Sequence, residues 1–245
     1  TADESVAVGR FCMKATTTGI DNTAVGAYSL DANTTGNYNT SLGYASLSAN
    51  TTGGSNTAIG TDALLSCTTG VNNVAVGRSC LTSLTTSNQN VVVGMGAGTT
   101  ITTGGNNVIL GFDAEPSSAT ANNEVVLGGS WITVLRCQQS SISSLSDRRD
   151  KKEIIDLPVG LDFIDSLKPV QFKWDSREGT ANDGKVRAGF IAQDLQEAQS
   201  GGNEYLDLIT DVNPERLEAK QGNLIPVLVQ AIKELSAKVA ALEAG

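Results

Sequence analysis

Histidine is absent from the chain of 245 residues. Its absence excludes Ser-His-Asp and Cys-His nucleophile pairs, and every metal site that needs an imidazole ligand. Acid–base or nucleophilic chemistry would therefore have to use Asp, Glu, Lys, Ser or Cys. No motif in the sequence indicates a metal or a cofactor, and we expect neither.

Positive charge and long apolar runs are also scarce. The formal net charge is -9, which argues against a nucleic-acid partner because neutralising phosphates needs clustered Lys and Arg. We find no secretory signal and no apolar run long enough to span a bilayer. We therefore expect a soluble protein without membrane insertion.

The four cysteines are widely spaced and match no zinc or redox motif. They are Cys12, Cys67, Cys80 and Cys137. We expect reduced thiols that pack as small hydrophobic side chains.

A repeat of seventeen residues fills the first half of the chain. Its marker is a glycine at Gly9, Gly26, Gly43, Gly60, Gly77, Gly94, Gly111 and Gly128. An asparagine stands four residues before most of these glycines, and a second glycine, usually preceded by two threonines, often stands ten residues after. Such a period predicts a solenoid, because one short unit cannot bury its apolar face but stacked units can.

The apolar residues of the repeat fall into columns. The residue before the marker glycine is apolar in all eight repeats, and the residue two positions earlier is Val or Thr. These two columns share one face of a strand because strand side chains alternate. The column between them is mostly small, and a further apolar column holds Met13, Leu30, Leu47, Leu64 and Leu81. We predict a short strand, a Gly or Asn turn, a second extended piece and a second turn per repeat, with the apolar face buried by stacking.

The repeat reads N-T-A-V-G-x-x-A and resembles the β-roll of trimeric autotransporter adhesin heads. The resemblance covers residues 1–128. It implies a trimeric parallel β-roll or β-helix with turns of seventeen residues. Aromatic residues make up only 4% of the chain, so the core must come from stacked aliphatic side chains and trimer contacts.

The distribution of charge changes abruptly after Leu145. Only four of the seventeen basic residues and eight of the twenty-six acidic ones precede this point. We predict a β-roll shaft over residues 1–128, a connector over 129–145 and a second, α+β domain over 146–245. Within that domain we expect a helix ending near Pro169, a strand over 170–174, a strand running into a helix over 187–195, and a helix over 224–243.

Four motifs follow one another in the second half. They are S-D-R-R-x-K at 146–151, L-K-P-V-x-F-x-W at 167–174, G-F-I-A-Q-D at 189–194 and P-V-L-V-Q-A-I-K-E-L at 226–235. Together they resemble the C-terminal intramolecular chaperone of phage endosialidases, tail fibres and neck appendages. The resemblance implies that this domain trimerises, templates folding of the repeat and then cuts itself off. It places the fibre in a virion and the released chaperone in the host cytoplasm.

The same resemblance implies a Ser-Lys dyad, which maps to Ser146 and Lys151, with cleavage between Leu145 and Ser146. The chain would then be a self-cleaving serine endopeptidase that turns over once. A lysine can act as the base only in its neutral form, which burial or nearby cations favour. The stretch alone is also typical of a polar linker. Asp150 stands where family members often carry an apolar residue.

The end of the chain carries a heptad pattern. Apolar residues spaced 3, 4, 3, 4, 3 are Ile225, Leu228, Ile232, Leu235, Val239 and Leu242. This spacing predicts the a/d seam of a trimeric coiled coil, although an amphipathic helix packed on its own domain would look similar.

The sequence leaves three candidate functions open. The first is a virion tail fibre with a self-processing assembly chaperone, whose shaft binds a glycan or protein receptor on the host-cell surface. The second is a trimeric surface adhesin without proteolytic activity. The third, an enzyme that degrades polysaccharides, would need a carboxylate pair in a cleft, and the repeat offers only scattered Asp and Glu.

Overall fold

The computed structural model describes residues 4–132, 134–136, 138, 146–175, 184–211, 213–215 and 217–245. The chain divides into two compact units, residues 1–133 and 134–245, called here the solenoid unit and the C-terminal unit. Within the described residues, no helix combines the length and apolarity that crossing a membrane requires.

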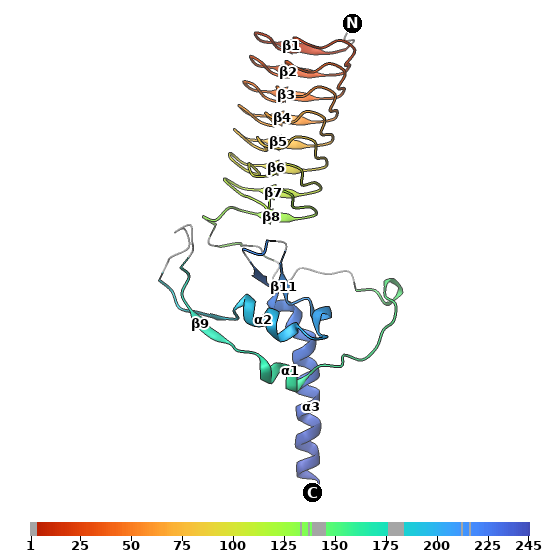
Figure 1. The fold of residues 1–245 in the computed structure, drawn as a ribbon, viewed down its shortest axis with the longest axis vertical. Coiled ribbons are helices and arrows are strands. Elements are labelled where there is room, and N and C mark those ends of the chain that lie inside the picture. The colour runs from red at the N-terminus through yellow and green to blue at the C-terminus, as the bar shows by residue number, and fades with distance from the viewer. Residues whose placement is uncertain are drawn as a thin grey trace. The chain divides into compact units, whose positions relative to one another are not determined.

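The solenoid unit is a ladder of eight parallel strands, with one three-residue strand per turn (Figure 1). The strands are β1 (Val6–Val8), β2 (Thr23–Val25), β3 (Thr40–Leu42), β4 (Thr57–Ile59), β5 (Val74–Val76), β6 (Val91–Val93), β7 (Val108–Leu110) and β8 (Val125–Leu127). Each residue pairs with its counterpart seventeen positions later, as Thr57 does with Val74. The predicted parallel β-solenoid is therefore confirmed.

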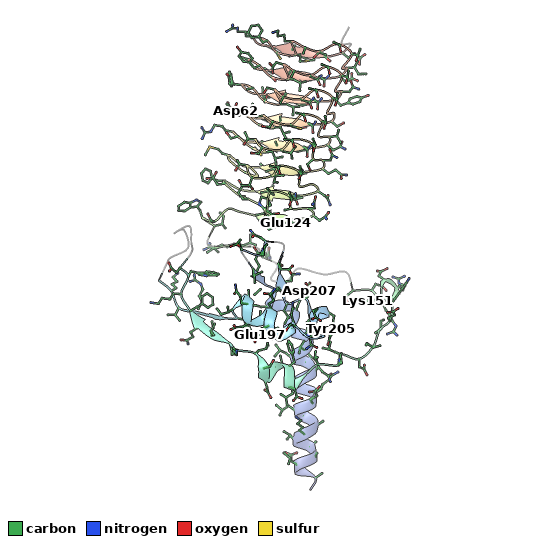
Figure 2. All side chains as sticks on the ribbon, viewed as in Figure 1. Asp62, Glu124, Lys151, Glu197, Tyr205 and Asp207 are labelled. Carbon is green, nitrogen blue, oxygen red and sulfur yellow. The ribbon has the colours of Figure 1, made fainter. Side chains whose placement is uncertain are left out.

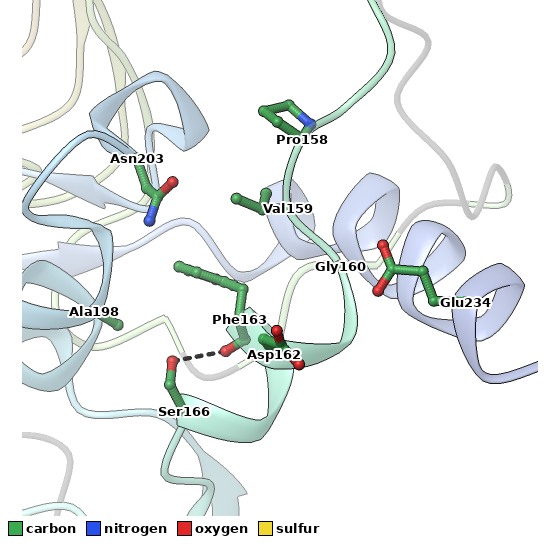
Figure 3. A pocket seen from close by; sticks show the side chains of 9 residues that line it. All are labelled: Pro158, Val159, Gly160, Asp162, Phe163, Ser166, Ala198, Asn203 and Glu234. Carbon is green, nitrogen blue, oxygen red and sulfur yellow. Dashed lines mark hydrogen bonds between the residues drawn. The ribbon is translucent and has the colours of Figure 1, made fainter. Parts of the chain in front are cut away.

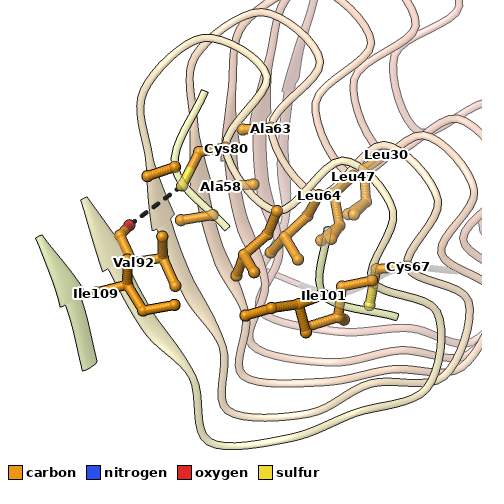
Figure 4. Packing of buried hydrophobic residues seen from close by; sticks show 14 of the residues in the cluster. Leu30, Leu47, Ala58, Ala63, Leu64, Cys67, Cys80, Val92, Ile101 and Ile109 are labelled. Carbon is orange, nitrogen blue, oxygen red and sulfur yellow. Dashed lines mark hydrogen bonds between the residues drawn. The ribbon is translucent and has the colours of Figure 1, made fainter. Parts of the chain in front are cut away.

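The central residue of each strand faces the interior. Ala58, Ala75 and Val92 are fully buried there, opposite the leucine column of Leu30, Leu47, Leu64 and Leu81 (Figure 4). The flanking columns, which we expected inside, face outward instead, and Leu42 is 47% exposed. A three-residue strand has room for one inward side chain. The narrow interior of a seventeen-residue turn is filled by that small residue and the leucine across from it.

The remainder of each turn differs from the predicted second extended piece. Leu47 and Leu64 have φ values of 53° and 52°, in the left-handed region. Their amides still bond to the following turn, as Leu47 N–H does to the Ala63 carbonyl at 2.9 Å. This conformation is unfavourable for a side chain with a Cβ, and burial of the leucine offsets the cost.

Two cysteines belong to the same core. Cys67 and Cys80 are buried free thiols, which confirms the predicted packing for this pair. Burial raises the pKa of the Cys67 thiol to about 11 and that of Cys80 to about 12. Cys137 lies outside the described residues.

An asparagine ladder runs through the solenoid. Its fully buried rungs are Asn22, Asn39, Asn56, Asn73, Asn90 and Asn107. The Asn56 Nδ2 donates to Asn39 Oδ1 at 3.1 Å and to the Gly70 carbonyl at 2.8 Å. The Asn56 Oδ1 accepts from the Asn73 backbone N–H at 3.0 Å. Each rung thus satisfies buried polar groups of the next turn, which explains the asparagine column in the sequence.

The marker glycines are fixed by space as well as by dihedral angle. Gly77 has φ 140°, and a Cβ there would lie 2.3 Å from the Gly94 carbonyl oxygen of the next turn. A side chain at this column would therefore collide with backbone rather than with a movable group.

The C-terminal unit mixes helices and short strands. Its elements are η1 (Arg148–Asp150), α1 (Leu161–Ser166), β9 (Val170–Phe172), β10 (Arg187–Gly189), α2 (Ala192–Gln199), η2 (Glu204–Leu206), β11 (Ile209–Thr210), β12 (Glu218–Ala219), η3 (Gln221–Leu224) and α3 (Ile225–Glu243). Strand β9 pairs antiparallel with β10, and β11 with β12. The helices and strands that we predicted from the sequence are all present.

A small core joins these elements. Phe163 of α1, Leu195 of α2 and Val227 of α3 meet in it. Glu234 of α3 adds a polar contact, because its carboxylate accepts the Leu161 N–H at the start of α1 at 2.8 Å. Only the first half of α3 takes part in this core.

Candidate active site

A short turn positions the two residues of the predicted dyad. Asp147 stands before the single 3-10 turn η1 and accepts the Arg149 backbone N–H at 2.8 Å. The Lys151 N–H then closes the turn on the Arg148 carbonyl at 3.2 Å. The chain therefore folds back on itself between Ser146 and Lys151.

The two predicted side chains meet. The Lys151 Nζ donates to the Ser146 Oγ at 2.7 Å. Both residues are exposed, and Lys151 projects from a loop of the C-terminal unit (Figure 2). A hydroxyl and an amine at this distance can exchange a proton directly, which is the relation between a nucleophile and its base.

Arg149 and Asp147 form an ion pair beside the dyad. The Arg149 Nη2 lies 2.6 Å from Asp147 Oδ2, and this contact, with the Arg149 backbone N–H, lowers the pKa of the Asp147 carboxyl. The sequence alone did not single out Asp147 as the residue that forms the turn. An Asp directly before a helical turn is the signal that could have indicated it.

The rest of the predicted cleavage site is only partly described. Leu145, the residue before the expected scissile bond, lies outside the described residues. Asp150 is exposed on η1 between the dyad residues.

Comparison with known proteins identifies this segment. Residues 146–202 match the family model Chaperone of endosialidase, Peptidase_S74. No curated protein and no solved structure matches the chain. The C-terminal region contains a chaperone-of-endosialidase domain.

The match begins at Ser146 and includes three of the four quoted motifs, while the terminal motif at 226–235 lies beyond it. A domain of this family is an intramolecular chaperone typical of phage tail fibres, which are trimeric, and membership implies a self-cleaving serine peptidase. A β-solenoid precedes the domain here, as the sequence predicted.

The predicted seam residues of α3 are all exposed in the described part of the chain. Ile225, Ile232 and Leu242 are 62%, 66% and 81% exposed, and Leu228, Leu235 and Val239 are exposed as well. The buried residues of α3 are instead Val227, which belongs to the core, and Ala231. At 100° per residue these lie on a face about 90° away from the seam.

The chaperone domain also borders a shallow pocket. Phe163, Ala198 and Asn203 line it, and Glu234 stands at its edge (Figure 3). It lies among α1, α2 and α3, away from the dyad residues in the sequence. No group of His, Cys, Asp or Glu within the described residues could hold a metal ion.

Proposed function

We propose that the chain is the shaft and assembly domain of a viral, phage-like tail fibre. The C-terminal unit trimerises, templates folding of the solenoid and then releases itself by cleaving the bond between Leu145 and Ser146. The observation that supports this most directly is the contact between Lys151 Nζ and Ser146 Oγ at the start of a chaperone-of-endosialidase domain.

The chemistry requires two steps. A neutral Lys151 amine removes the Ser146 hydroxyl proton, and the Oγ attacks the Leu145 carbonyl carbon. The new Oγ–C bond replaces the C–N peptide bond, and the freed Ser146 amine takes up a proton. Water then hydrolyses the ester, which leaves a carboxylate on Leu145 and restores the hydroxyl. No imidazole is needed, in keeping with a chain that lacks histidine.

The free half of α3 supports trimerisation. From Ile232 to Glu243 every residue except Glu234 is exposed. A helical segment this exposed is marginal on its own in water, and a strict a/d seam provides the missing contacts if two further copies pack against it.

The solenoid supports the same assembly. The column before the marker glycine is apolar in all eight turns although it faces outward, with Val8 at 57% and Leu127 at 52% exposure. This apolar column repeats once per turn, about every 4.8 Å, so it matches a partner whose turns have the same spacing. Another copy of the solenoid, parallel and in register, has that rise.

This organisation explains the need for a template. Seventeen-residue turns of similar sequence can pair out of register between chains at little cost. A trimer formed first at the C-terminal unit would align the three chains. Cleavage afterwards removes the template, so that unfolding can no longer run back through it.

The dyad is tested by expressing the chain beside Ser146→Ala, Lys151→Ala and Lys151→Arg. Wild type should give pieces of roughly 14 and 11 kDa from the chain length, with a new N-terminus at Ser146. All three variants should stay uncut, because arginine keeps the charge but cannot become neutral. Lys152→Ala is the matched control and should be cut like wild type.

An uncut wild-type chain that still forms trimers would exclude the protease and favour the adhesin-like alternative, with Asp150→Leu as the next variant.

Trimerisation itself is tested by light scattering on uncut Lys151→Ala chains. Ile232→Asp on the seam should lower the mass to that of a monomer, and Lys233→Asp beside it should not. Equal masses for both would contradict the coiled coil.

A further inference from the structure

Aromatic side chains gather at one corner of the first three solenoid turns. The two positions after the marker glycine hold Phe11 in the first turn, Tyr28 in the second and Tyr44 in the third. The Phe11 and Tyr28 ring centroids lie 5.4 Å apart, and those of Tyr28 and Tyr44 lie 5.9 Å apart. Phe11 is 39% and Tyr44 54% exposed. The rings form a continuous apolar strip open to solvent.

Two cations lie over the Phe11 ring of the strip. The Arg10 guanidinium lies 4.6 Å from the Phe11 ring centroid and the Lys14 ammonium 5.2 Å from it. Over residues 4–132 the only other basic residue is Arg78. Asp31 lies one turn after Lys14 in the same column, so the corner keeps an excess of positive charge on an otherwise acidic unit. We call Arg10, Phe11, Lys14, Tyr28 and Tyr44 the aromatic corner.

The fold does not require these aromatic residues. At the position of Phe11 and Tyr28, later turns carry Asp62 (Figure 2) and Ser79 with the same backbone, at φ 59° and 56° against 58° and 60°. Asp tolerates this left-handed conformation better than a bulky side chain does. The conformation itself belongs to the repeat, since later turns share it, so the fold does not explain why the first turns carry aromatic rings there.

We propose that the aromatic corner binds an acidic carbohydrate. The exposed part of the strip, above all the Tyr44 ring, contacts the C–H faces of sugar rings, and the two cations held over Phe11 pair with carboxylates on the same chain of sugars. The strip crosses three turns, so that it presents successive contacts along an extended glycan. This site belongs to the solenoid unit alone and does not depend on the proposed self-cleavage.

The test uses the full chain and affinity electrophoresis through gels that contain a carboxylated polysaccharide. The probes are polygalacturonate, alginate, hyaluronate and polysialate, with neutral dextran and dextran sulfate as references. At least one carboxylated probe should retard the chain, and dextran should not. Retardation should weaken with added salt because the cations are exposed.

The deciding variant replaces each aromatic with a residue that the repeat itself uses at that position. Phe11→Ser, Tyr28→Ser and Tyr44→Thr together should weaken binding at least about tenfold, the factor expected for losing one good contact with an aromatic face. Phe112→Thr, in the column of Tyr44 four turns later, is the matched control and should bind normally. Both proteins should still unfold cooperatively and keep the far-UV circular dichroism of wild type, which shows that the solenoid is intact.

Three results would overturn the proposal. The first is no retardation by any carboxylated probe. The second is retardation that dextran sulfate reproduces and the triple variant retains, which would reduce the site to charge alone. The third is a triple variant with altered oligomeric mass, which would make the corner a contact between copies.

Discussion

The asparagine ladder allows a sharp test of what holds the solenoid together. In Asn56→Ala the Gly70 carbonyl loses the Nδ2 that bonds it at 2.8 Å, and the Asn73 backbone N–H loses the Oδ1 that accepts it at 3.0 Å. Both groups are buried where water cannot replace the amide. At 1–3 kcal/mol for each unsatisfied group, the substitution should cost about 2–6 kcal/mol.

Asn88 provides the matched control. Like Asn56, it accepts a backbone N–H from a neighbouring turn through its Oδ1, here that of Val71 at 2.8 Å, but this contact is exposed. Water can satisfy the Val71 amide in Asn88→Ala, so the cost should stay below about 1 kcal/mol. The free energies of unfolding are compared by urea titration and far-UV circular dichroism on Lys151→Ala chains, which remain uncut.

Asn56→Asp sharpens the test further. A carboxylate has the shape of the amide but cannot donate to Gly70, and burial disfavours its charge. The aspartate should therefore have a raised pKa in the folded state, and stability should increase as the pH falls through that value, since the folded state binds more protons. Equal costs for Asn56→Ala and Asn88→Ala, or no pH dependence in Asn56→Asp, would refute the reasoning.

Three further predictions follow from single contacts. Gly77→Ala should destabilise the solenoid by more than about 4 kcal/mol, because its methyl group meets the Gly94 carbonyl; a mild effect on urea unfolding would contradict the close contact. The Cys80 thiol, whose pKa burial raises to about 12, should resist iodoacetamide at pH 8 until the chain is unfolded; labelling of the native protein, located by peptide mass, would contradict its burial. The Leu161 N–H lowers the pKa of Glu234. The contribution of the ionised Glu234 to stability is therefore present above an unfolded pKa of about 4.3 and is lost as the pH falls. Glu234→Ala should accordingly lower the calorimetric melting temperature of the C-terminal unit at pH 7 but not at pH 3, and equal losses at both would contradict the contact.

The sequence predicted the period and strand positions of the solenoid because stacking forces each column to repeat one residue type. It did not predict which strand face lies inside. Val25 and Ala24 both suit a strand, and only the width of the closed turn determines that the alanine faces inward. The left-handed leucines were missed for a similar reason, since a positive φ at Leu64 depends on tertiary burial and not on local preference.

The candidate site was predictable to a different degree. Ser146 and Lys151 came from the motif and the resemblance, while the Asp147 side chain that shapes the turn between them needs coordinates to be recognised. The seam of α3 could be read from its spacing. That spacing could not separate a coiled coil from packing on the chain's own core, and the burial of Val227 with the exposure of Ile232 shows that a different face of α3 contacts the core.

The turns of the solenoid share the same columns of residues, so the length of the shaft can change only by whole turns. Because each rung contacts only its neighbours, removing residues 44–60 would join Gly43 to Thr61 and leave every remaining rung with a partner of the same kind. The shaft would become shorter by one strand spacing, ~4.8 Å. Removing sixteen residues instead would place the asparagine amide out of line with the next rung. Length in this molecule is therefore set in whole steps of seventeen residues.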